Sequence, residues 1–394
     1  MNDLIYLDNA ATTAVKPEVV EAMLPYFTEV YSNPSSVYRF AGKAKKAMED
    51  AREQIAGFVG AKPAEIYFTG GGSESDNWAI KAVAENYREK GKHIITSKIE
   101  HHAVLHTCEW LEKKGYEVTY LDVDENGIIS LEELERAIRP DTILITIMFA
   151  NNEIGTIEPV KEIGEIARKH DVLFHTDAVQ AFAHVPVNVE EMNIDLMSAS
   201  GHKFYGPKGI GFLYIKNGIR ISPLIHGGAQ ERSRRAGTHN VSGIIGMAKA
   251  AEIAIADMEE NSRKETEIRD HLIHRIEQEI PYVRVNGHRE KRLPGNVNVC
   301  FRFVEGESLL IMLDQKGICA SSGSACTSGS LDPSHVLLAI GLPHEIAHGS
   351  VRLTLSDTTT REEADYVVDN LKEIVERMRS MSPLYDDFIK RKED

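Results

Sequence analysis

Three short segments of the chain carry side chains that suit the chemistry of one cofactor. Lys203 stands between Gly201 and Gly206 just after a strand-like run, a setting in which a desolvated amine has a lowered pKa and can form a Schiff base. Asp177 ends another strand-like run, where an acid can hold a protonated ring nitrogen. The glycine-rich segment 69–75 joins a strand to a helix, so its backbone N–H groups and the helix dipole can attract a phosphate. Together these features predict a site for pyridoxal 5'-phosphate (PLP).

Each of these segments has a plainer interpretation when it is taken alone. A glycine-rich segment is often only a tight turn, and an aspartate at a strand end often caps the next helix. Most lysines simply lie at the surface. The prediction therefore depends on the three segments occurring together.

A fourth segment places a cysteine among small residues. Cys326 lies in the run 321–330, which otherwise holds serine, glycine, alanine and threonine. Buried free cysteines pack as small hydrophobes, but this run offers nothing for a thiol to pack against. The sequence predicts an exposed thiol on a mobile loop.

The elements that position these residues follow an alternating pattern. Between residues 65 and 215, short β-branched or apolar runs alternate with segments of helical spacing, which predicts a mostly parallel, helix-covered α/β sheet. The strand-like runs are 65–69, 93–97, 117–123, 142–150, 172–178, 196–201 and 209–215, and the helical segments between them are 74–90, 103–114, 131–138 and 160–170.

The remaining sequence predicts further helices and a second domain. Helical spacing at 16–31, 40–59 and 241–278 belongs to the large unit and its link to the next one. After Pro281, strand-like pieces at 297–303 and 351–355 are mixed with helices at 308–315 and 361–378. We expect a large α/β domain at 14–258, a small α+β domain at 259–394, and segment 1–13 packing against the small domain.

Composition excludes several classes of protein. The 394 residues include 45 Lys+Arg and 60 Asp+Glu, a net charge of −15 that argues against a surface for nucleic acid or anionic membrane. The longest apolar run, 142–150, is too short to span a bilayer, and no signal peptide begins the chain. Four scattered cysteines, Cys108, Cys300, Cys319 and Cys326, are too few for a disulfide framework. We expect a cytoplasmic enzyme with free thiols.

Two metal-binding patterns occur but have weak context. Segment 122–133 fits a calcium loop, yet a strand-like stretch precedes it where such a loop needs a helix, so a strand–turn–helix link is the plainer interpretation. Segment 344–348 fits the zinc-peptidase pattern His-Glu-x-x-His, but Pro343 and Gly349 leave room for barely one helical turn. A calcium-binding module and a zinc peptidase are remote alternatives.

Beyond these patterns, the sequence resembles the cysteine desulfurases of the NifS/IscS type, PLP enzymes of the aminotransferase-like fold (fold type I). The likeness runs through almost the whole chain and is most specific around Lys203 and Cys326. Segments 328–335 and 347–350 look closer to the NifS branch. The matching segments are 6–13, 33–36, 74–77, 100–101, 151–155, 175–180, 200–209, 235–238, 321–331 and 349–352.

The resemblance implies which residues bind PLP. Lys203 would form the Schiff base and later move protons, and His101 would stack on the ring and take part in acid–base steps. Asp177 would pair with the pyridine nitrogen, Gln180 with the ring hydroxyl oxygen. The phosphate would be held by Gly72, Ser73, Ser200 and His202, with Thr238 of the partner subunit reaching it across a homodimer.

The resemblance also implies a reaction. Asn152, beside PLP, and Arg352 would receive the carboxylate of L-cysteine, and Cys326 would be the nucleophile that becomes a persulfide as L-alanine forms. The sulfur would pass to an iron–sulfur scaffold protein or another acceptor, and so supply iron–sulfur cluster assembly. A selenocysteine lyase and a class V aminotransferase are the alternatives within the same fold.

Overall fold

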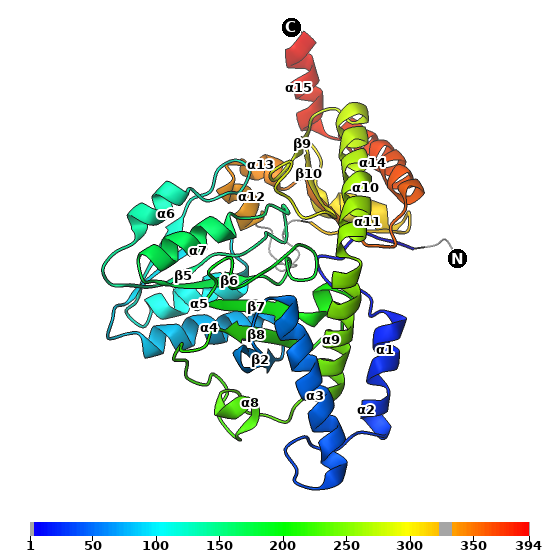
Figure 1. Ribbon diagram of the computed structural model, residues 1–394. Coiled ribbons are helices and arrows are strands. Elements are labelled where there is room, and N and C mark those ends of the chain that lie inside the picture. The colour runs from blue at the N-terminus through cyan, green and yellow to red at the C-terminus, as the bar shows by residue number, and fades with distance from the viewer. Residues whose placement is uncertain (1–3, 323–332, 394) are drawn as a thin grey trace.

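The fold is built around a seven-stranded sheet. The computed structural model describes residues 4–322 and 333–393. The strand order is β2–β8–β7–β6–β5–β3–β4 (Figure 1), and β3 to β7 pair in parallel, which confirms the predicted α/β class. The strands are β2 (Ile66–Thr69), β3 (His93–Ser97), β4 (Glu117–Leu121), β5 (Thr142–Thr146), β6 (Leu173–Asp177), β7 (Leu196–Ser200) and β8 (Gly211–Ile215).

One strand runs against the others, which the alternating pattern did not predict. β8 pairs antiparallel with both β7 and β2. Only residues 201–210 connect β7 to β8, and their helical content is the short 3₁₀ turn η2 (Gly201–Lys203). A parallel crossover needs a dozen or more residues, so this connection turns the chain back. Because β2 is antiparallel to β8, the carboxyl end of β2 lies at the same edge as those of β3 to β7.

Helices cover both faces of this sheet. On one face lie α4 (Gly72–Asn86) and α5 (His102–Glu112), whose Trp78, Val104 and Cys108 are fully buried among sheet residues. On the other face, Phe182, Phe204 and Phe212 meet in edge-to-face ring contacts within one continuous apolar cluster. The helices that contribute to that cluster are α1 (Pro17–Met23), α3 (Arg39–Phe58), α6 (Leu131–Ala137), α7 (Val160–Lys169) and α9 (Val241–Ala256).

A second, antiparallel sheet lies in the upper part of Figure 1, beyond the long helix α10 (Met258–Glu279). Its strand order is β12–β10–β9, and α10, α11 (Gly306–Asp314) and α14 (Arg361–Ser380) bury their apolar sides against it. The start of the chain joins this part, because β1 (Ile5–Tyr6) pairs with β11 (Ile318–Cys319). The three strands are β9 (Val283–Val285), β10 (Asn296–Phe301) and β12 (Ser350–Thr354). The domain boundary at 258/259 stays a prediction.

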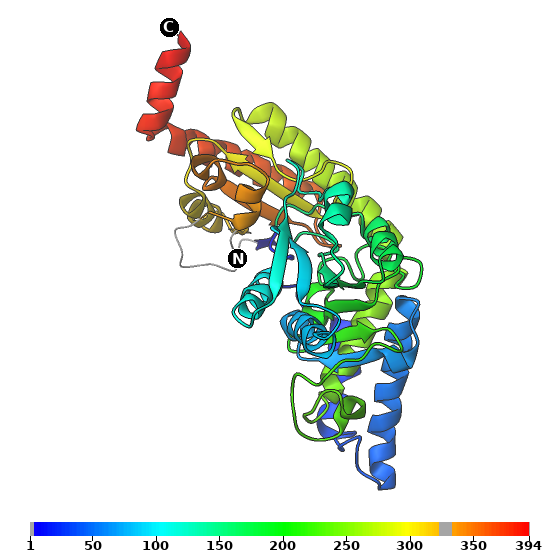
Figure 2. The same ribbon diagram turned by 90° about the vertical axis from the view of Figure 1, so that its left-hand side faces the viewer.

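Two helices predicted as continuous are each divided. The segment 16–31 forms α1 (Pro17–Met23) and α2 (Pro25–Thr28), because a proline inside a helix removes an N–H donor and clashes with the preceding turn. The segment 241–278 breaks at Asp257, whose ψ of 4° lies outside the helical region. The remaining short helices are α8 (Gln230–Ser233), α12 (His335–Ala339) and α13 (His344–Ala347), and α15 (Pro383–Glu393) projects from the body (Figure 2).

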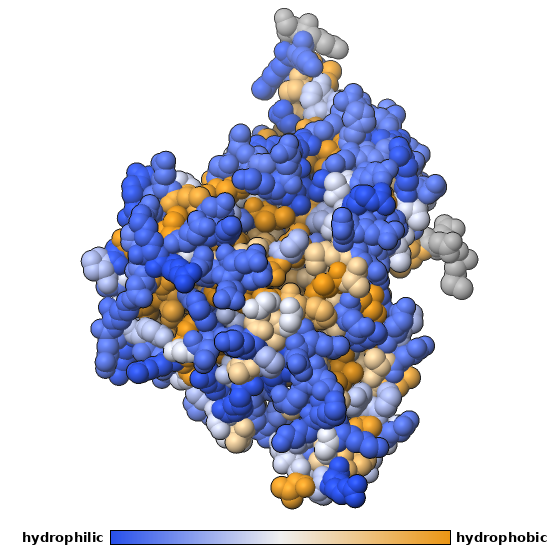
Figure 3. Space-filling model, viewed as in Figure 1, coloured by the Kyte–Doolittle hydropathy of each residue, from blue (hydrophilic) through white to orange (hydrophobic). Residues whose placement is uncertain are grey.

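The described helices include none that is long and apolar enough to cross a membrane. The face in Figure 3 is mostly hydrophilic, with smaller apolar areas, one of them at the lower tip where the segment between α2 and α3 lies. The exposed apolar side chains of that segment are Tyr31, Val37 and Tyr38.

A buried ion pair joins α3 to α8. The two guanidinium Nη atoms of Arg52 each donate to one carboxylate oxygen of Glu231 over 2.8 Å, and both side chains are almost fully buried. Glu231 also accepts from the backbone N–H of Phe68. The pair therefore anchors α8, in which Glu231, Arg232 and Ser233 have left-handed φ values of 44°, 57° and 63°.

We expect Arg52→Ala to lower the free energy of unfolding by about 3–5 kcal/mol, because the Glu231 carboxylate would stay buried without its cation. Burial raises the pKa of Glu231, but Arg52 and His239 lower it to about 2. The pair thus stabilises the fold above the ordinary Glu pKa of about 4.3, and this stabilisation is lost as the pH falls toward 2.

Urea unfolding at neutral and acid pH checks this prediction. Lys46→Ala is the matched control, because the ion pair of Lys46 with Asp50 lies exposed on the same helix. Equal losses of stability in the two variants would contradict the importance of the buried pair.

Candidate active site

The carboxyl ends of β2, β3, β5, β6 and β7 meet at one edge of the large sheet and border a cavity of about 290 Å³. Ligands of open α/β sheets bind at this edge. The predicted site residues, apart from Thr238 and Cys326, all line this cavity. Its lining is Ala10, Ala11, Gly72, Ser73, Asp76, His101, Met148, Ala150, Asn152, Asp177, Val179, Gln180, Ser200, His202, Lys203 and Arg352.

The amino end of α4 provides a cradle for a phosphate. Gly71, at φ 147°, has a backbone conformation that residues with side chains rarely adopt. A Cβ atom on Gly72 would lie 2.5 Å from Cγ2 of Val179, so a side chain there would require Val179 to shift. The first N–H groups of a helix have no intrahelical acceptor, and here they stay uncovered at the cavity wall, where Ser73 also lies. The residues present therefore fit the phosphate of PLP.

Lys203 is held by the start of the chain. Its Nζ donates to the carbonyl oxygens of Ala10 over 2.6 Å and of Ala11 over 2.9 Å. His184 Nε2 donates to the backbone oxygen of Lys203 over 3.0 Å, and η2 follows β7 without a gap. The amine is thus fixed at the carboxyl end of a central strand, as the Schiff-base prediction requires.

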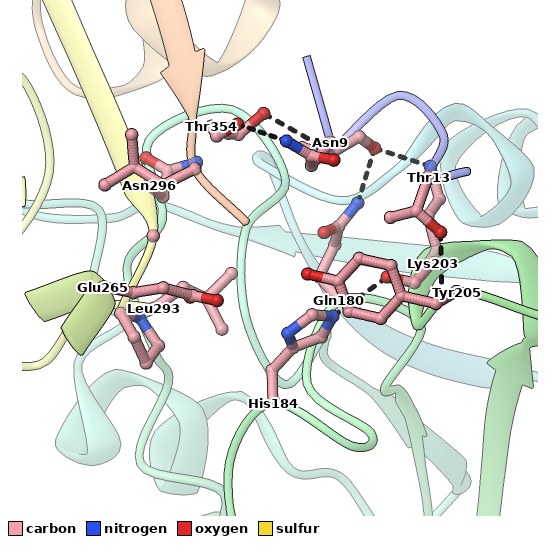
Figure 4. Close-up of a pocket in the computed structure, with 14 residues that line it drawn as sticks. Asn9, Thr13, Gln180, His184, Lys203, Tyr205, Glu265, Leu293, Asn296 and Thr354 are labelled. Atoms are coloured by element: carbon pink, nitrogen blue, oxygen red, sulfur yellow. Dashed lines mark hydrogen bonds between the residues drawn. The ribbon is translucent and has the colours of Figure 1, made fainter. Parts of the chain in front are cut away.

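Figure 4 shows how the N-terminal segment is fastened around Lys203. Asn9 Nδ2 donates to the backbone oxygen of Thr354, and Gln180 Nε2 donates to that of Ala10. Thr13 Oγ1 donates to the carbonyl oxygen of His202 over 3.0 Å. The segment therefore links β12 to the lysine. A second, smaller cavity of about 40 Å³ lies here, and the residues around it include Asn9, Ala10, Thr13, Gln180, Lys203 and Thr354.

His101 caps the amino end of α5. Its Nδ1 accepts the backbone N–H of Ala103 over 3.1 Å, so the ring proton sits on Nε2. Burial lowers the pKa of His101 to about 4, helped by the charges of Lys203 and neighbouring histidines. The imidazole is therefore neutral at neutral pH and carries an N–H on one nitrogen.

Asp177 is the last residue of β6 and is only 6% exposed. Burial raises its pKa to about 6, while the N–H of Val179, donated to Oδ1 over 2.9 Å, and the charge of Lys203 limit the rise. The carboxylate is thus ionised at neutral pH and can face a cation. Sequence reasoning missed a second buried acid, Asp76, although it lies four residues after Gly72 and so on the same helix face as the cradle.

Arg352 brings a guanidinium from the small sheet into the cavity. It lies on β12, is 2% exposed, and donates from Nη1 to the backbone oxygen of Asn152 over 3.0 Å. Its Nη2 is 2.9 Å from a carboxylate oxygen of Asp8, and its Nε has no hydrogen-bond partner among the described residues. A buried arginine with an unused donor is suited to bind a carboxylate.

Two predicted site residues lie elsewhere. Cys326 lies outside the described residues. Ser321, five residues before it in the sequence, pairs through its backbone with Arg352 of the site. Thr238 is exposed and does not line the cavity of its own chain. The loop that carries Thr238 is fixed to α4 through Arg235, whose Nε is 2.8 Å from a carboxylate oxygen of Glu74.

The segment with the calcium-loop pattern follows β4, a strand, as its plainer interpretation predicts. Asp124 Oδ1 accepts the backbone N–H groups of Asn126 and Ile128, each over 2.9 Å. Asp122 is paired with Lys98. These contacts describe a strand–turn–helix link in which the acids already serve the turn.

The zinc-peptidase pattern at 344–348 falls on α13, a helix of four residues. His344 and His348 are both exposed on the surface. Within the described ranges, the acid and histidine atoms that converge closely belong instead to Asp76, His101 and Asp177, in the cavity described above.

A mostly parallel sheet with a lysine, an acid and a phosphate cradle at its carboxyl edge defines the class of aminotransferase-like PLP enzymes. The family model described as Aminotransferase class-V matches residues 5–367. The cysteine desulfurase IscS of Methanosarcina thermophila is 60% identical over 383 residues, 97% of this chain and 95% of that protein.

Comparison with solved structures supports the same class of enzyme. A NifS-like protein superposes with a TM-score of 0.89 at 40% identity, covering 95% of this chain and 99% of its own. The structure titled SspA in complex with cysteine has a TM-score of 0.80 at 41% identity and covers 90% and 100%. The chain therefore belongs to the cysteine desulfurases of the class-V aminotransferase family, which are PLP-dependent enzymes with the predicted fold.

Proposed function

We propose that this enzyme works as a homodimer that converts L-cysteine to L-alanine and keeps the sulfur as a persulfide on Cys326. The observation that carries this proposal is the convergence of the Lys203 amine, the Asp177 carboxylate and the Arg352 guanidinium on one cavity. A related protein solved with cysteine supports L-cysteine as the substrate.

Residues that line the cavity would hold PLP. The amino end of α4 at Gly72 and Ser73, with Ser200 and His202, would bind its phosphate. Asp177 would bind the ring nitrogen, Gln180 the ring hydroxyl oxygen, and His101 would stack on the ring beside Asn152. When bound, PLP supplies an electron sink that makes bonds to the substrate Cα and Cβ labile.

Proton transfer falls to Lys203 and His101. Lys203 lies between two backbone carbonyls at the cavity wall, where its amine can take the Cα proton of the substrate. His101 keeps Nδ1 engaged with Ala103, so its Nε2–H is the ring donor left to act inside the cavity. Because His101 is neutral at neutral pH, this N–H can hydrogen-bond to the substrate and share its proton in the acid–base steps.

Arg352 and Asn152 would orient the substrate carboxylate. We expect Arg352→Gln to lower kcat/KM for L-cysteine roughly 10- to 100-fold, the equivalent of losing a hydrogen bond to a charged group. The loss should appear mainly in KM. Arg352→Lys should recover only part of it, because an ammonium cannot match the two-pronged geometry of a guanidinium.

Steady-state kinetics of both variants check this prediction, with thermal melting to confirm that β12 still pairs with β10. An unchanged KM in Arg352→Gln would contradict a role in carboxylate binding.

Among the described cysteines, none is a ready thiolate. Burial raises the pKa of Cys300 to about 11, and burial also raises those of Cys108 and Cys319. Cys326 follows Ser321 by five residues in the sequence, and Ser321 pairs with Arg352.

The proposed transfer of sulfur to Cys326 is balanced in atoms and electrons. Its thiolate forms an S–S bond to the substrate sulfur while the Cβ–S bond breaks. The electron pair of that bond stays with the substrate carbon, which takes up a proton and becomes L-alanine. The persulfide would then pass sulfur to an iron–sulfur scaffold protein or another thiol acceptor.

A dimer is supported by two surface features. Thr238 is exposed on the loop after α8 and does not line the cavity of its own chain. The second feature is a set of exposed apolar side chains that lie close to one another in the sequence, from α1 to the first turn of α3. They are Val20, Leu24, Phe27, Tyr31, Val37, Tyr38 and Phe40. A fully active monomer in sizing chromatography with activity assays would contradict the dimer.

The product assay tests the whole proposal. Enzyme loaded with PLP and given L-cysteine with a reducing thiol should form L-alanine and sulfide in equal amounts. A requirement for a keto acid would favour an aminotransferase, and a strong preference for L-selenocysteine would favour a selenocysteine lyase. Full activity after chelation would remove both metal-dependent alternatives.

A further inference from the structure

Two buried acids share the cavity where the ring nitrogen of PLP is proposed to bind. Asp76 comes from α4 and is 1% exposed, and Asp177 comes from β6 and is 6% exposed. A carboxylate oxygen of each, together with a ring nitrogen of His101, all lie within 4.8 Å of one another. Two carboxylates this close and this buried cannot both carry a charge at neutral pH.

Among the described residues, no lysine or arginine forms an ion pair with Asp76. The basic atom next to it, Nε2 of His175, is 3.6 Å from Oδ1, which is too far for a hydrogen bond. His175 itself is engaged with hydroxyls of Thr146 and Ser198, and burial lowers its pKa to about 3, so it is neutral. Oδ1 of Asp76 has no hydrogen-bond partner within the described part of the chain.

The other groups around the pair favour Asp177 as the charged member. Asp177 Oδ1 accepts the N–H of Val179, and the charge of Lys203 acts on it. The buried Glu100 is a further acid near Asp76, and it also raises the pKa of Asp76. Burial, then the charge of Asp177, raises the pKa of Asp76 well above its usual range, although the Ser198 hydroxyl opposes this.

We propose that Asp76 is a positioning residue that carries a proton at neutral pH and stands as the neutral, hydrogen-bond-donating neighbour of Asp177. Its neutrality leaves one negative charge facing the ring nitrogen, and its O–H is a donor that can orient the Asp177 carboxylate. The part of this inference that concerns PLP rests on the proposed function, whereas the protonation of Asp76 does not.

Infrared spectroscopy of the PLP-free protein tests the protonation directly. At neutral pH, protein labelled with ¹³C at the aspartate carboxyl groups should show a shifted carbonyl band of a protonated carboxylic acid. Aspartate labelling separates this band from those of the buried glutamates Glu100, Glu153, Glu158 and Glu265. Asp76→Asn should remove the band. Absence of any aspartate-derived band in the parent protein would overturn the proposal without testing desulfurase activity.

Titration of the PLP-free protein with PLP, followed by fluorescence, tests the positioning role. Asn has the shape of a protonated Asp and keeps a donor, so Asp76→Asn should bind PLP within about threefold of the parent. Asp76→Ala removes the donor and should weaken binding about tenfold. Equal weakening in the two variants would overturn the role of the donor, because it would mean that the charge or the packing of Asp76 matters instead.

Discussion

Lys203→Ala is expected to abolish covalent attachment of the cofactor and to reduce L-alanine formation roughly 1,000-fold or more. The amine is the group proposed to bind PLP covalently and to take the substrate proton, and no other lysine of the described residues lines the cavity. Borohydride treatment followed by intact-mass measurement reads the attachment. The parent protein should gain the mass of reduced cofactor, and the variant should not.

The fold should survive this substitution. Lys203 contacts the carbonyl oxygens of Ala10 and Ala11 at a cavity that water can enter, so these acceptors are not left in an apolar environment. Lys208→Ala is the matched control, because Lys208 is exposed five residues later on the same connection between β7 and β8. Retained covalent cofactor in Lys203→Ala, or its loss in Lys208→Ala, would contradict the assignment.

The location of the site could be predicted because it depends on local sequence. Asp177 ends a strand, Lys203 and the glycine cradle come within three residues after one, and the carboxyl ends of parallel strands share one edge. The glycine at 71 is favoured by its positive φ, and the glycine at 72 by its close packing on Val179. Side chains placed by these rules converge once the sheet forms.

Contacts between distant parts of the chain could not be predicted in this way. Lys203 meets Ala10 across 193 residues, and Arg352 meets Asp8 across 344. Neither pairing leaves a periodic pattern, because each depends on how the second sheet and the N-terminal segment dock on the first. The role of Arg352 was predicted from the resemblance to cysteine desulfurases. The sequence around Arg352 did not by itself indicate that role.

The reversed direction of β8 and the inward orientation of Asp76 were missed for different reasons. The length of the 201–210 connection, which forces the turn, was available in the sequence but was outweighed by the alternation of strands and helices. Asp76 lies on the helix face of Gly72, Ile80 and Val83, so helical spacing indicates that it is buried, although an acid is rarely expected there.

Cys326→Ser is expected to separate cofactor binding from sulfur transfer. PLP binding should be unchanged, because none of the groups that line the cavity is altered. The external complex with L-cysteine should also still form, since it needs Lys203 and Arg352 but no enzyme thiol. L-Alanine and sulfide production should fall at least about 1,000-fold, since a serine hydroxyl is neither ionised at neutral pH nor a good nucleophile toward sulfur.

Cys319→Ser provides the control for that experiment. Cys319 is the most accessible of the described cysteines, and it lies in β11, close in sequence to the segment that carries Cys326. Burial and the nearby acids Asp314 and Asp8 raise its pKa, so its thiol is poorly suited to attack at neutral pH, and Cys319→Ser should retain most activity. Mass spectrometry of the parent enzyme after brief exposure to L-cysteine should locate one additional sulfur on the peptide that contains Cys326. If that sulfur were found on Cys319, or if Cys326→Ser kept turning over cysteine while Cys319→Ser did not, the nucleophile would be Cys319.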